Sequence, residues 1–462
     1  MKDFGDTIAA IATAPGAGGL AVLRVSGSRA LAVAGALMSE AALERASDHS
    51  LHHAWAHWPG RPAERIDEVV AAIFRAPRSY TREDVVEISC HGGPLTARRL
   101  LAALEAAGAR GALPGEFTMR AFLNGRIDLA QAEAVADLIQ AENEAARELA
   151  LSQLAGSLSH DLAEIESAIA DAAAEVEARV DFAEDVGGIE VPPNVGEAIR
   201  AAHSRLAALL EGSAWARAIR EGLNIPIVGK PNVGKSSLFN ALLGEERAIV
   251  MHLAGTTRDR VSESVEILGL RVRLSDTAGL REGGEPIERL GIERTRAALG
   301  EARIAIWVLD ASEPLAAEDL AIVGALAARR VLVAFNKSDR EIRLDRDAAL
   351  ASLNGPAVRG VQVSAITGAG LEDLRCALVE LAGGTPHEKP NGPVAAHPRH
   401  VSSIERARAA LARSVDAARS GECGEIVALE LRESLDALGE VTGRCASEEL
   451  LDRIFARFCI GK

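Results

Sequence analysis

The sequence lacks an apolar run long enough to cross a membrane and a readable export signal. No such run within the 462 residues approaches the roughly 20 residues that span a bilayer. The start of the chain, MKDFGDTIAA, has Asp3 and Asp6 around Phe4 and no basic flank before an apolar run. These absences exclude a membrane-spanning protein and predict a cytoplasmic location.

Paired cysteines and an excess of positive charge are also missing. The five cysteines are scattered without paired spacing, which fits neither a disulfide framework nor a zinc site, so we expect most of them to be inert thiols. The formal net charge of −15 argues against a broad phosphate-binding face. Any role with nucleic acid must therefore be local or shared with a partner.

The length predicts several domains, because 462 residues exceed the size at which a single core stops growing. Residues 1–118 mix β-branched runs such as AVLRVSG and EDVVEISC with turn signals, which predicts a small α+β domain. Residues 119–218 carry apolar residues at helical spacing. Residues 219–382 alternate apolar runs with helical segments, which predicts a doubly wound, mostly parallel sheet. A Pro- and Gly-rich linker opens residues 383–462, where helical patterning resumes. The predicted fold class is thus multidomain, with an α/β domain inserted into a helical one.

A phosphate-binding loop opens the α/β segment. GKPNVGKS, from Gly229 to Ser236, lies between a predicted strand and a predicted helix, which is the context that supports such a loop. Glycines let backbone N–H groups turn toward phosphates, Lys235 reaches the outer phosphates, and the Ser236 hydroxyl ligates magnesium. The predicted phosphate-binding residues are Asn232, Val233, Gly234, Lys235, Ser236 and Ser237.

The base is read further along the chain, at NKSD. The Asp339 carboxylate accepts hydrogen bonds only, so it suits the ring N–H and exocyclic amine of guanine, whereas adenine presents an acceptor there. Taken alone, NKSD is equally well explained as a polar turn, but its place two strands after the phosphate loop favours guanine and hence GTP. SAIT, from Ser364, adds backbone contacts to the base. The predicted base-binding residues are Asn336, Lys337, Asp339, Ser364 and Ala365.

The segments AGTTRD and DTAG have the pattern of switch elements that sense a γ-phosphate. Thr257 is expected to close over magnesium, Asp276 to hold the ion through water, and the Gly279 N–H to contact the phosphate. The predicted switch residues are Thr256, Thr257, Asp276, Thr277, Ala278 and Gly279.

Two common catalytic groups are absent. Leu280 stands where many GTPases have a water-positioning Gln, and no arginine finger is identifiable. Glu288, in a Gly-rich stretch, is the candidate to position the water, although composition alone favours a solvated helix-face carboxylate. Asn232 could ligate a monovalent cation in place of the arginine, or could be a turn residue only.

These motifs, in this order, resemble the family of tRNA-modification GTPases MnmE, also called TrmE. The resemblance extends from DTIAAIATAPGAGGLAVLRVSG through SYTREDVVEISCHGG, PGEFTMRAFLNGRIDLAQAEAVADLI and ERLGIER to the terminal FCIGK. It implies a homodimer joined through the amino-terminal domains and a flavoprotein partner, MnmG, in a heterotetramer or larger assembly. With that partner the family installs an aminomethyl-type group at carbon 5 of the wobble uridine of certain tRNAs.

The resemblance also implies ligand sites. GTP hydrolysis in the family depends on potassium and on contact between two GTPase domains, which places potassium at Asn232 and the loop from Met251 through Leu253 to Thr256, and magnesium at Ser236 and Thr257. A tetrahydrofolate derivative, 5-formyl or 5,10-methylene, is implied in the amino-terminal domain. The folate-binding residues carried over to this sequence are Arg24, Glu87, Arg126 and Lys462, with Cys459 near the one-carbon unit.

From the residues alone, these folate positions have simpler explanations. Arg24 and Glu87 lie in strand-like segments and could form a surface ion pair, and Cys459 could be a packed tail thiol. The sequence also has Arg82 where the family pattern has Gly, and Arg126 where it has Lys. A regulatory GTPase switch acting on RNA or the ribosome, which needs no one-carbon pocket, stays open as an alternative function.

Overall fold

The computed structural model describes residues 5–38, 43–181, 192–244, 262–276, 299–300, 302–326, 329–353, 357–385, 393–420 and 424–461. The chain divides into two compact units. The first contains residues 1–136, 153–166 and 432–462, and the second contains residues 137–152 and 167–431.

The second unit contains a doubly wound sheet, as the alternating pattern predicts. Its strands lie in the order β12-β11-β10-β7-β9-β8, and neighbouring strands are parallel except for β8 and β9. The strands are β7 (Leu223–Val228), β8 (Ser262–Ile267), β9 (Leu270–Asp276), β10 (Ile304–Asp310), β11 (Arg330–Asn336) and β12 (Ala357–Gln362). Strands β7, β9, β10 and β11 coincide with the predicted apolar runs LNIPIVG, VRLSDTAG, AIWVLD and VLVAFNKSD, whereas β12 ends at Gln362, two residues into the predicted run VQVSAITG. The edge strand β8 was not predicted; Leu268 and Gly269, both with positive φ, turn it back along β9 in a hairpin of the two-residue kind.

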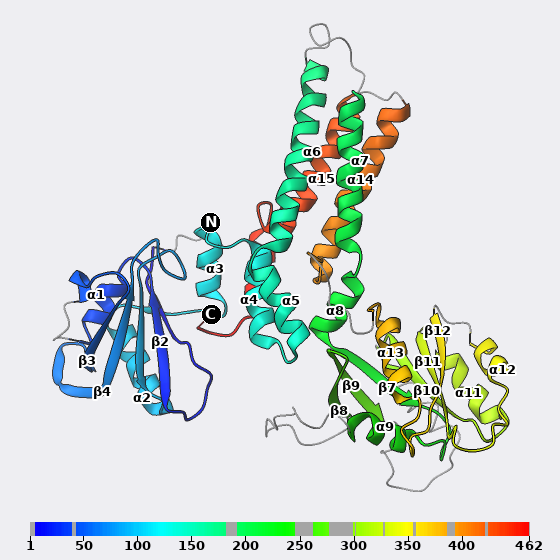
Figure 1. The fold of residues 1–462 in the computed structure, drawn as a ribbon. Coiled ribbons are helices and arrows are strands. Elements are labelled where there is room, and N and C mark those ends of the chain that lie inside the picture. Colours follow the sequence, from blue (N-terminus) through cyan, green and yellow to red (C-terminus); the bar gives the residue numbers. More distant parts are fainter. Residues whose placement is uncertain are drawn as a thin grey trace. The chain divides into compact units, whose positions relative to one another are not determined.

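Helices cover both faces of this sheet (Figure 1). Alternate residues of β10 point to opposite faces, so Ile306 joins a core with α9 (Lys235–Gly244) and α13 (Leu371–Ala382), whereas Trp307 joins the other core with α11 (Ala317–Leu326) and α12 (Arg346–Ala351). Burial on both faces explains why the central strands read as continuous apolar runs rather than as alternating ones.

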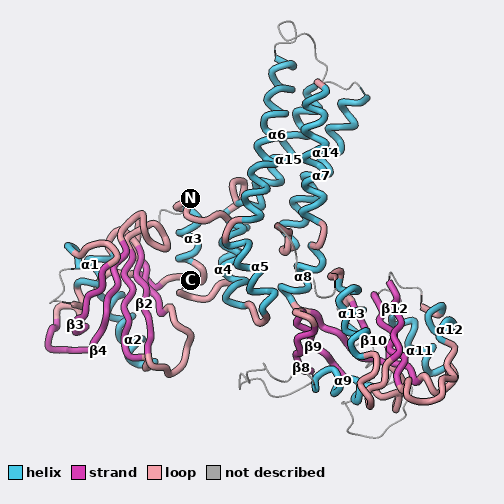
Figure 2. Tube along the Cα trace, in the orientation of Figure 1, coloured by secondary structure: helices cyan, strands magenta, loops and turns pink. Residues whose placement is uncertain are grey.

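The predicted helical segments are confirmed (Figure 2). In the second unit α7 and α14 pack along each other. The helices of these segments are α4 (Leu129–Gln140), α5 (Glu144–Leu154), α6 (Ser157–Asp181), α7 (Pro193–Leu210), α8 (Ser213–Glu221), α14 (Pro398–Ser420), α15 (Gly424–Thr442) and α16 (Glu448–Phe455). No helix in the described part of the chain is both long and apolar enough to cross a membrane.

The amino-terminal α+β fold in the first unit is built on a second sheet, with strand order β3-β4-β5-β2-β1-β6. Its strands are β1 (Ile8–Ile11), β2 (Leu20–Ser26), β3 (Ser50–Trp58), β4 (Arg61–Phe74), β5 (Val85–His91) and β6 (Arg110–Gly111). Strands β1 and β6 pair in parallel, and the other neighbouring strands described in this sheet pair antiparallel. The helices associated with it are α1 (Ala30–Gly35), the 3-10 helix η1 (Leu43–Arg45), α2 (Pro94–Ala106) and α3 (Glu116–Leu123).

The strand period of two divides this sheet into two different faces. Leu23 of β2 and Ile88 of β5 are fully buried in the core shared with α1 and α2. Their neighbours Arg24 and Glu87 therefore point to the opposite face. Phe117 of α3 is buried on that opposite side with Ile8 of β1. The sequence alternation thus brings two charged residues onto the face that carries α3.

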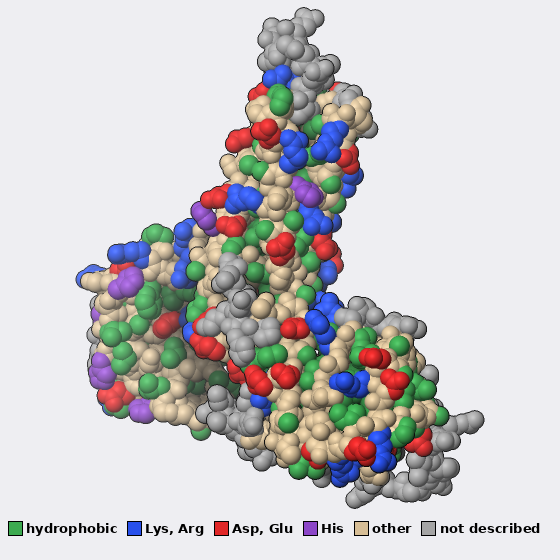
Figure 3. Space-filling model, turned by 45° about the vertical axis from the view of Figure 1, so that its right-hand side comes forward, with side chains coloured by type: hydrophobic (Ala, Val, Ile, Leu, Met, Phe, Trp, Pro, Cys, Tyr) green, Lys and Arg blue, Asp and Glu red, His purple; other side chains and the backbone are tan. Residues whose placement is uncertain are grey.

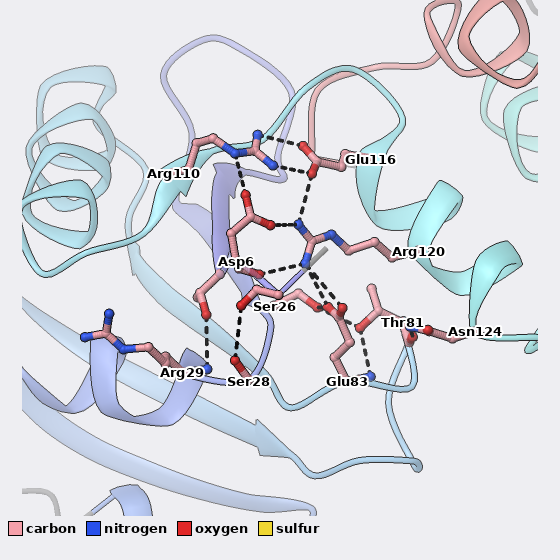
Figure 4. Close-up of polar contacts among 12 residues, drawn as sticks. Asp6, Ser26, Ser28, Arg29, Thr81, Glu83, Arg110, Glu116, Arg120 and Asn124 are labelled. Carbon is pink, nitrogen blue, oxygen red and sulfur yellow. Dashed lines mark hydrogen bonds and ion pairs between the residues drawn. The ribbon is translucent and has the colours of Figure 1, made fainter. Parts of the chain in front are cut away.

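A buried polar network holds α3 against the sheet (Figure 4). Arg120 is 1% exposed and donates to Asp6 Oδ1 at 2.6 Å, to Glu116 Oε1 at 3.0 Å and to Glu83 Oε1 at 3.2 Å. Arg110 donates to Glu116 Oε1 at 2.5 Å and to Asp6 Oδ2 at 2.7 Å. Two guanidinium groups thus pair with three carboxylates, so that each of these charges has a partner of opposite sign, which lowers the cost of burying them.

The network shifts the titration of its carboxylates. Burial by itself would raise the pKa of Glu116, but hydrogen bonds from Arg110, the Leu113 amide and Arg120 outweigh it and hold that pKa below its ordinary value. The pKa of Asp6 is also lowered, because the bonds from Arg110 and Arg120 outweigh its desolvation.

The attachment of α3 should therefore weaken in acid. A lowered folded-state pKa gives stability that is present above the unfolded pKa of about 4 and is lost as the pH falls through the folded value. Hydrogen exchange of the α3 amides, measured from pH 7 down to about pH 2 and corrected for the intrinsic exchange rate, should show protection that is constant above about pH 4 and falls below it. Glu116→Gln should reduce protection by about 3 kcal/mol at pH 7, since it breaks a buried ion pair, and should flatten the pH dependence. The exposed Glu105→Gln serves as control; the same flattening there would contradict the assignment.

Candidate functional site

The predicted phosphate loop lies at the carboxyl end of β7 and leads into α9. Gly229 immediately follows the strand, and α9 begins at Lys235. The Lys235 side chain is 7% exposed, and its Nζ donates to the carbonyls of Gly229 at 2.9 Å and Lys230 at 2.8 Å. Ser236 and Ser237 are exposed in the first turn of the helix. A helix amino terminus with its unpaired N–H groups favours bound anions, so this end of α9 suits phosphate groups.

Asn336, at the end of β11, joins the phosphate loop to the predicted base-binding loop. It is 2% exposed; its Nδ2 donates to the Val233 carbonyl at 2.8 Å, and its Oδ1 accepts from the Ala365 N–H at 3.0 Å. A Cβ added to Gly234, which has a φ of +98°, would lie 2.2 Å from Asn336 Nδ2. Glycine is therefore required for the loop to approach this amide.

Asp339 and Lys337 each have a defined partner. The Ser364 hydroxyl donates to Asp339 Oδ1 at 2.6 Å and thereby lowers the pKa of that carboxyl. Lys337 Nζ donates to Asp310 Oδ2 at 2.5 Å. Burial would raise the pKa of Asp310, but the bonds from Lys337 and Ser312 outweigh it, so the carboxyl stays ionised and neutralises the lysine. The Asp339 carboxylate is thus held ready to accept from two N–H groups of a base.

Part of the predicted nucleotide site lies outside the described residues. Asp276 ends β9, and only its backbone is described. The predicted residues that fall outside the described part of the chain are Met251, Leu253, Thr256, Thr257, Thr277, Ala278, Gly279, Glu288 and, at the carboxyl end, Lys462. Within the described ranges, no group of three or more His, Cys, Asp or Glu side chains could hold a metal ion.

The predicted folate residues Arg24 and Glu87 are directly opposite each other on β2 and β5. Arg24 Nε and Glu87 Oε1 are 2.8 Å apart, and both side chains are partly exposed. The chain terminus reaches the same place, because Arg24 also donates to the Gly461 carbonyl at 3.3 Å. Arg24 and Glu87 thus form the ion pair that their positions on neighbouring strands suggest. The Arg24 side chain of this pair also contacts the carboxyl-terminal tail.

Tyr80, the single tyrosine of the chain, is in contact with two guanidinium groups. The Cζ atoms of Arg24 and Arg126 lie 5.0 and 4.8 Å from its ring centroid, within the range of cation–π attraction. Arg126 also donates to the Tyr80 carbonyl at 2.9 Å. The predicted residues Arg24 and Arg126, far apart in sequence, are therefore brought together through a residue that the sequence reading did not single out.

The carboxyl-terminal tail docks against the amino-terminal sheet through Gly461. This residue is buried with a φ of +94°, and a Cβ there would lie 2.6 Å from the Ile11 carbonyl oxygen. Phe455 and Phe458 are buried against α3 and α4, and the Gly115 N–H donates to the Cys459 carbonyl at 3.4 Å. The Cys459 side chain is exposed.

Other cysteines behave differently from Cys459. Cys90 is buried in the core under α1 and α2, and burial together with the Asp67 charge raises the pKa of its thiol to about 11. Such a thiol is unreactive at neutral pH. Cys445 is exposed, and none of the four described cysteines forms a disulfide.

The sequence reading missed several pairings because they join distant segments. Lys230 of the phosphate loop pairs with Glu313 at 3.0 Å and with Asp319 at 3.3 Å. Arg110 and Arg120 reach Asp6 across more than one hundred residues. No sequence spacing signals such contacts.

The doubly wound sheet, the glycine-bearing loop before α9 and the base-binding motif on β11 define the class: this is a P-loop GTPase domain placed within a helical framework. On the face drawn in Figure 3, basic and acidic side chains are interspersed rather than segregated.

Comparison of the sequence with protein-family models and with known proteins identifies the family. The model for the MnmE helical domain matches residues 129–459, and that for the GTP-binding protein TrmE N-terminus matches residues 7–126. The tRNA modification GTPases MnmE of Geobacter metallireducens and Symbiobacterium thermophilum are each 43% identical over 99% of both chains. That of Alkaliphilus metalliredigens is 40% identical over 99% of both chains. The chain belongs to the MnmE family of tRNA modification GTPases.

The docking of the tail should depend on Gly461. Gly461→Ala would force a Cβ against backbone atoms of β1 that cannot rotate away, so the tail should leave the sheet about ten times more often. Carboxypeptidase digestion of the intact protein should release the terminal residues correspondingly faster. Gly60→Ala is the matched control, because Gly60 also has a positive φ, +71°, but nothing lies within 4 Å of its added Cβ. Equal release rates in the two variants would contradict tight docking.

Proposed function

We propose that this protein is the GTP-hydrolysing component of the system that modifies carbon 5 of the wobble uridine in tRNA, acting with a flavoprotein partner, MnmG. The observation that carries the proposal is the family relationship, which extends over 99% of the chain and is not confined to the GTPase segment. A GTPase serving only as a regulatory switch would need the nucleotide site alone. The relationship of residues 7–126 and of the terminal helices favours the enzyme.

The nucleotide would be held by the loops at the carboxyl ends of β7 and β11. The amino terminus of α9 and Lys235 suit the phosphates, and Asp339 suits guanine. Asn336 bonds to both loops and holds them at a fixed separation. Magnesium bound at Ser236 and Thr257 would neutralise charge on the phosphates. Glu288 is proposed to position the attacking water, because Leu280 cannot do so.

The site on the amino-terminal sheet is proposed to bind a tetrahydrofolate derivative that supplies a one-carbon unit. Glu87 can accept from the adjacent N–H donors of a pterin, and Arg24 and Arg126 can hold carboxylates. The docked tail supports this role, because it brings the Gly461 carbonyl to Arg24 and would carry Lys462 to the same region. Cys459 is exposed on that tail and available for chemistry at a bound one-carbon unit.

The assembly is proposed to be a cytoplasmic homodimer joined through residues 1–118, with helical segments 119–218 and 383–462 carrying the GTPase domain 219–382. A potassium ion held by Asn232 and by the backbone from Met251 through Leu253 to Thr256 would take the place of an arginine finger when two GTPase domains meet. Potassium supplies positive charge next to the transferred phosphoryl group. The tRNA would be bound largely together with the flavoprotein, since the net charge of −15 offers little unaided attraction to RNA.

Guanine recognition can be tested at Asp339. Asp339→Asn replaces an acceptor with a group that matches the carbonyl of xanthine, so GTP affinity should fall about one hundredfold while xanthosine triphosphate binds better. Fluorescent-nucleotide titration of the purified protein measures both. Asp347→Asn, at an exposed position in the first turn of α12, is the control. A retained preference for guanine would rule out the assigned role.

Potassium dependence tests the hydrolytic mechanism. GTP turnover in potassium chloride should exceed turnover in sodium chloride of equal ionic strength by about tenfold or more, since the charge that the ion replaces is worth at least that factor. Glu288→Ala should abolish turnover and spare GTP binding. Equal rates in the two salts would refute the potassium site, and full turnover by Glu288→Ala would refute the role of Glu288.

A further inference from the structure

A cavity of about 480 Å³ opens beside Tyr80, on the side of Arg126. Its volume lies in the range of small-ligand pockets. Three arginines, Arg78, Arg82 and Arg126, line it together with Ser79 and Tyr80, and among the described residues no acidic side chain is part of the lining. The lining is thus strongly cationic in a protein whose net charge is −15.

The three guanidinium groups retain donors for a ligand. Arg82 donates to the Asn124 carbonyl at 3.0 Å, and Arg126 donates to the Tyr80 carbonyl at 2.9 Å. Arg78 pairs with Asp48 at 2.6 Å, and its side chain is 74% exposed. Each guanidinium has five N–H donors in a planar fork that fits a carboxylate, so these contacts leave most of the donors for an anion.

Arg82 occupies an unfavourable backbone conformation. Its φ is +61°, in the left-handed region where glycine is favoured and a long side chain is strained. Residues held in such a conformation concentrate at binding sites. The strain at Arg82 is therefore consistent with a side chain that is kept for a ligand.

The cavity is connected to the proposed folate site through shared residues. Arg126 lines the cavity and also stacks on Tyr80, whose ring is contacted by Arg24, the partner of Glu87. A pterin near Glu87 would direct the other end of a folate, which carries glutamate carboxylates, along Tyr80 toward Arg126. Intracellular folates extend that end with further γ-linked glutamates, each adding one carboxylate.

We propose that the cavity lined by Arg78, Arg82 and Arg126 binds the polyglutamate tail of the folate, so that this protein selects folates by tail length. The proposal rests on the proposed folate role of the amino-terminal sheet. Arg82 and Arg78 act as specificity-determining residues for the added glutamates, whereas Arg24, Glu87 and Arg126 hold the part of the ligand common to all folates.

The test compares 5-formyl-tetrahydrofolate carrying one glutamate with the same folate carrying three, by calorimetric titration of the full chain at several salt concentrations. The wild-type protein should bind the triglutamate about ten times more tightly, and the preference should shrink as salt rises, because exposed charge pairs are screened. Arg82→Gly, which relieves the backbone strain, and Arg78→Gln should each reduce the preference to about threefold or less and leave monoglutamate affinity within about twofold.

Arg98→Gln is the matched control, because Arg98 is an exposed arginine on α2 outside the cavity. It should keep the tenfold preference. Equal binding of the two folates by the wild-type protein would overturn the tail site while leaving the folate role intact. Binding of neither folate would overturn the folate role and the tail site together.

The same titrations distinguish the folate tail from RNA phosphates. One outcome would overturn the proposal and assign the cavity to RNA. In that outcome a short single-stranded RNA binds the wild-type protein and binds the Arg82→Gly variant more weakly, while the wild-type protein shows no preference between the two folates.

Discussion

The nucleotide site depends on one buried amide. Asn336 uses both ends of its side chain, one for the Val233 carbonyl in the phosphate loop and one for the Ala365 N–H in the base-binding loop. A buried amide with an unpaired end costs free energy, so these two loops are held at a fixed separation. Gly234 is required for the same reason, because any side chain there would displace the amide. The separation of the two loops that are proposed to hold the guanine and the phosphates is therefore set by packing in the protein.

The amino-terminal site is stabilised in a different way. Arg120 and Glu116 fix α3 to the sheet through bonds to Asp6, Glu83 and Arg110, and the tail packs against β1 through Gly461. The tail contacts Arg24, which in turn contacts Glu87 and Tyr80, and Arg126 contacts the same Tyr80 ring. The proposed folate site would therefore be assembled only when the strands and the chain terminus are all in place.

Much of the fold could be predicted because its signals are local. The alternation of apolar runs and helical segments predicted the doubly wound sheet, and the spacing of GKPNVGKS and NKSD predicted which loops carry the site. The edge strand β8 was not predicted, because four of the six residues of Ser262–Ile267 are polar and its only signal was the turn at Leu268 and Gly269. The ion-pair networks were not predicted, because nothing in the order of residues indicates which charged side chains will be neighbours.

The sequence by itself determined the family, the class of nucleotide and the face on which Arg24 and Glu87 lie, since motif spacing and strand alternation operate over a few residues. The resemblance, by assigning Lys462 and Cys459 to the folate site, already implied that the tail returns to the amino-terminal domain, and the contact between Arg24 and Gly461 agrees with this. Only the tertiary structure decided that Tyr80 contacts both Arg24 and Arg126, and that Arg82 lines a cationic cavity. These features depend on long-range packing. They also depend on whether the free energy gained by pairing a charge exceeds the cost of burying it, and the partners for such pairing come from segments that are distant in sequence.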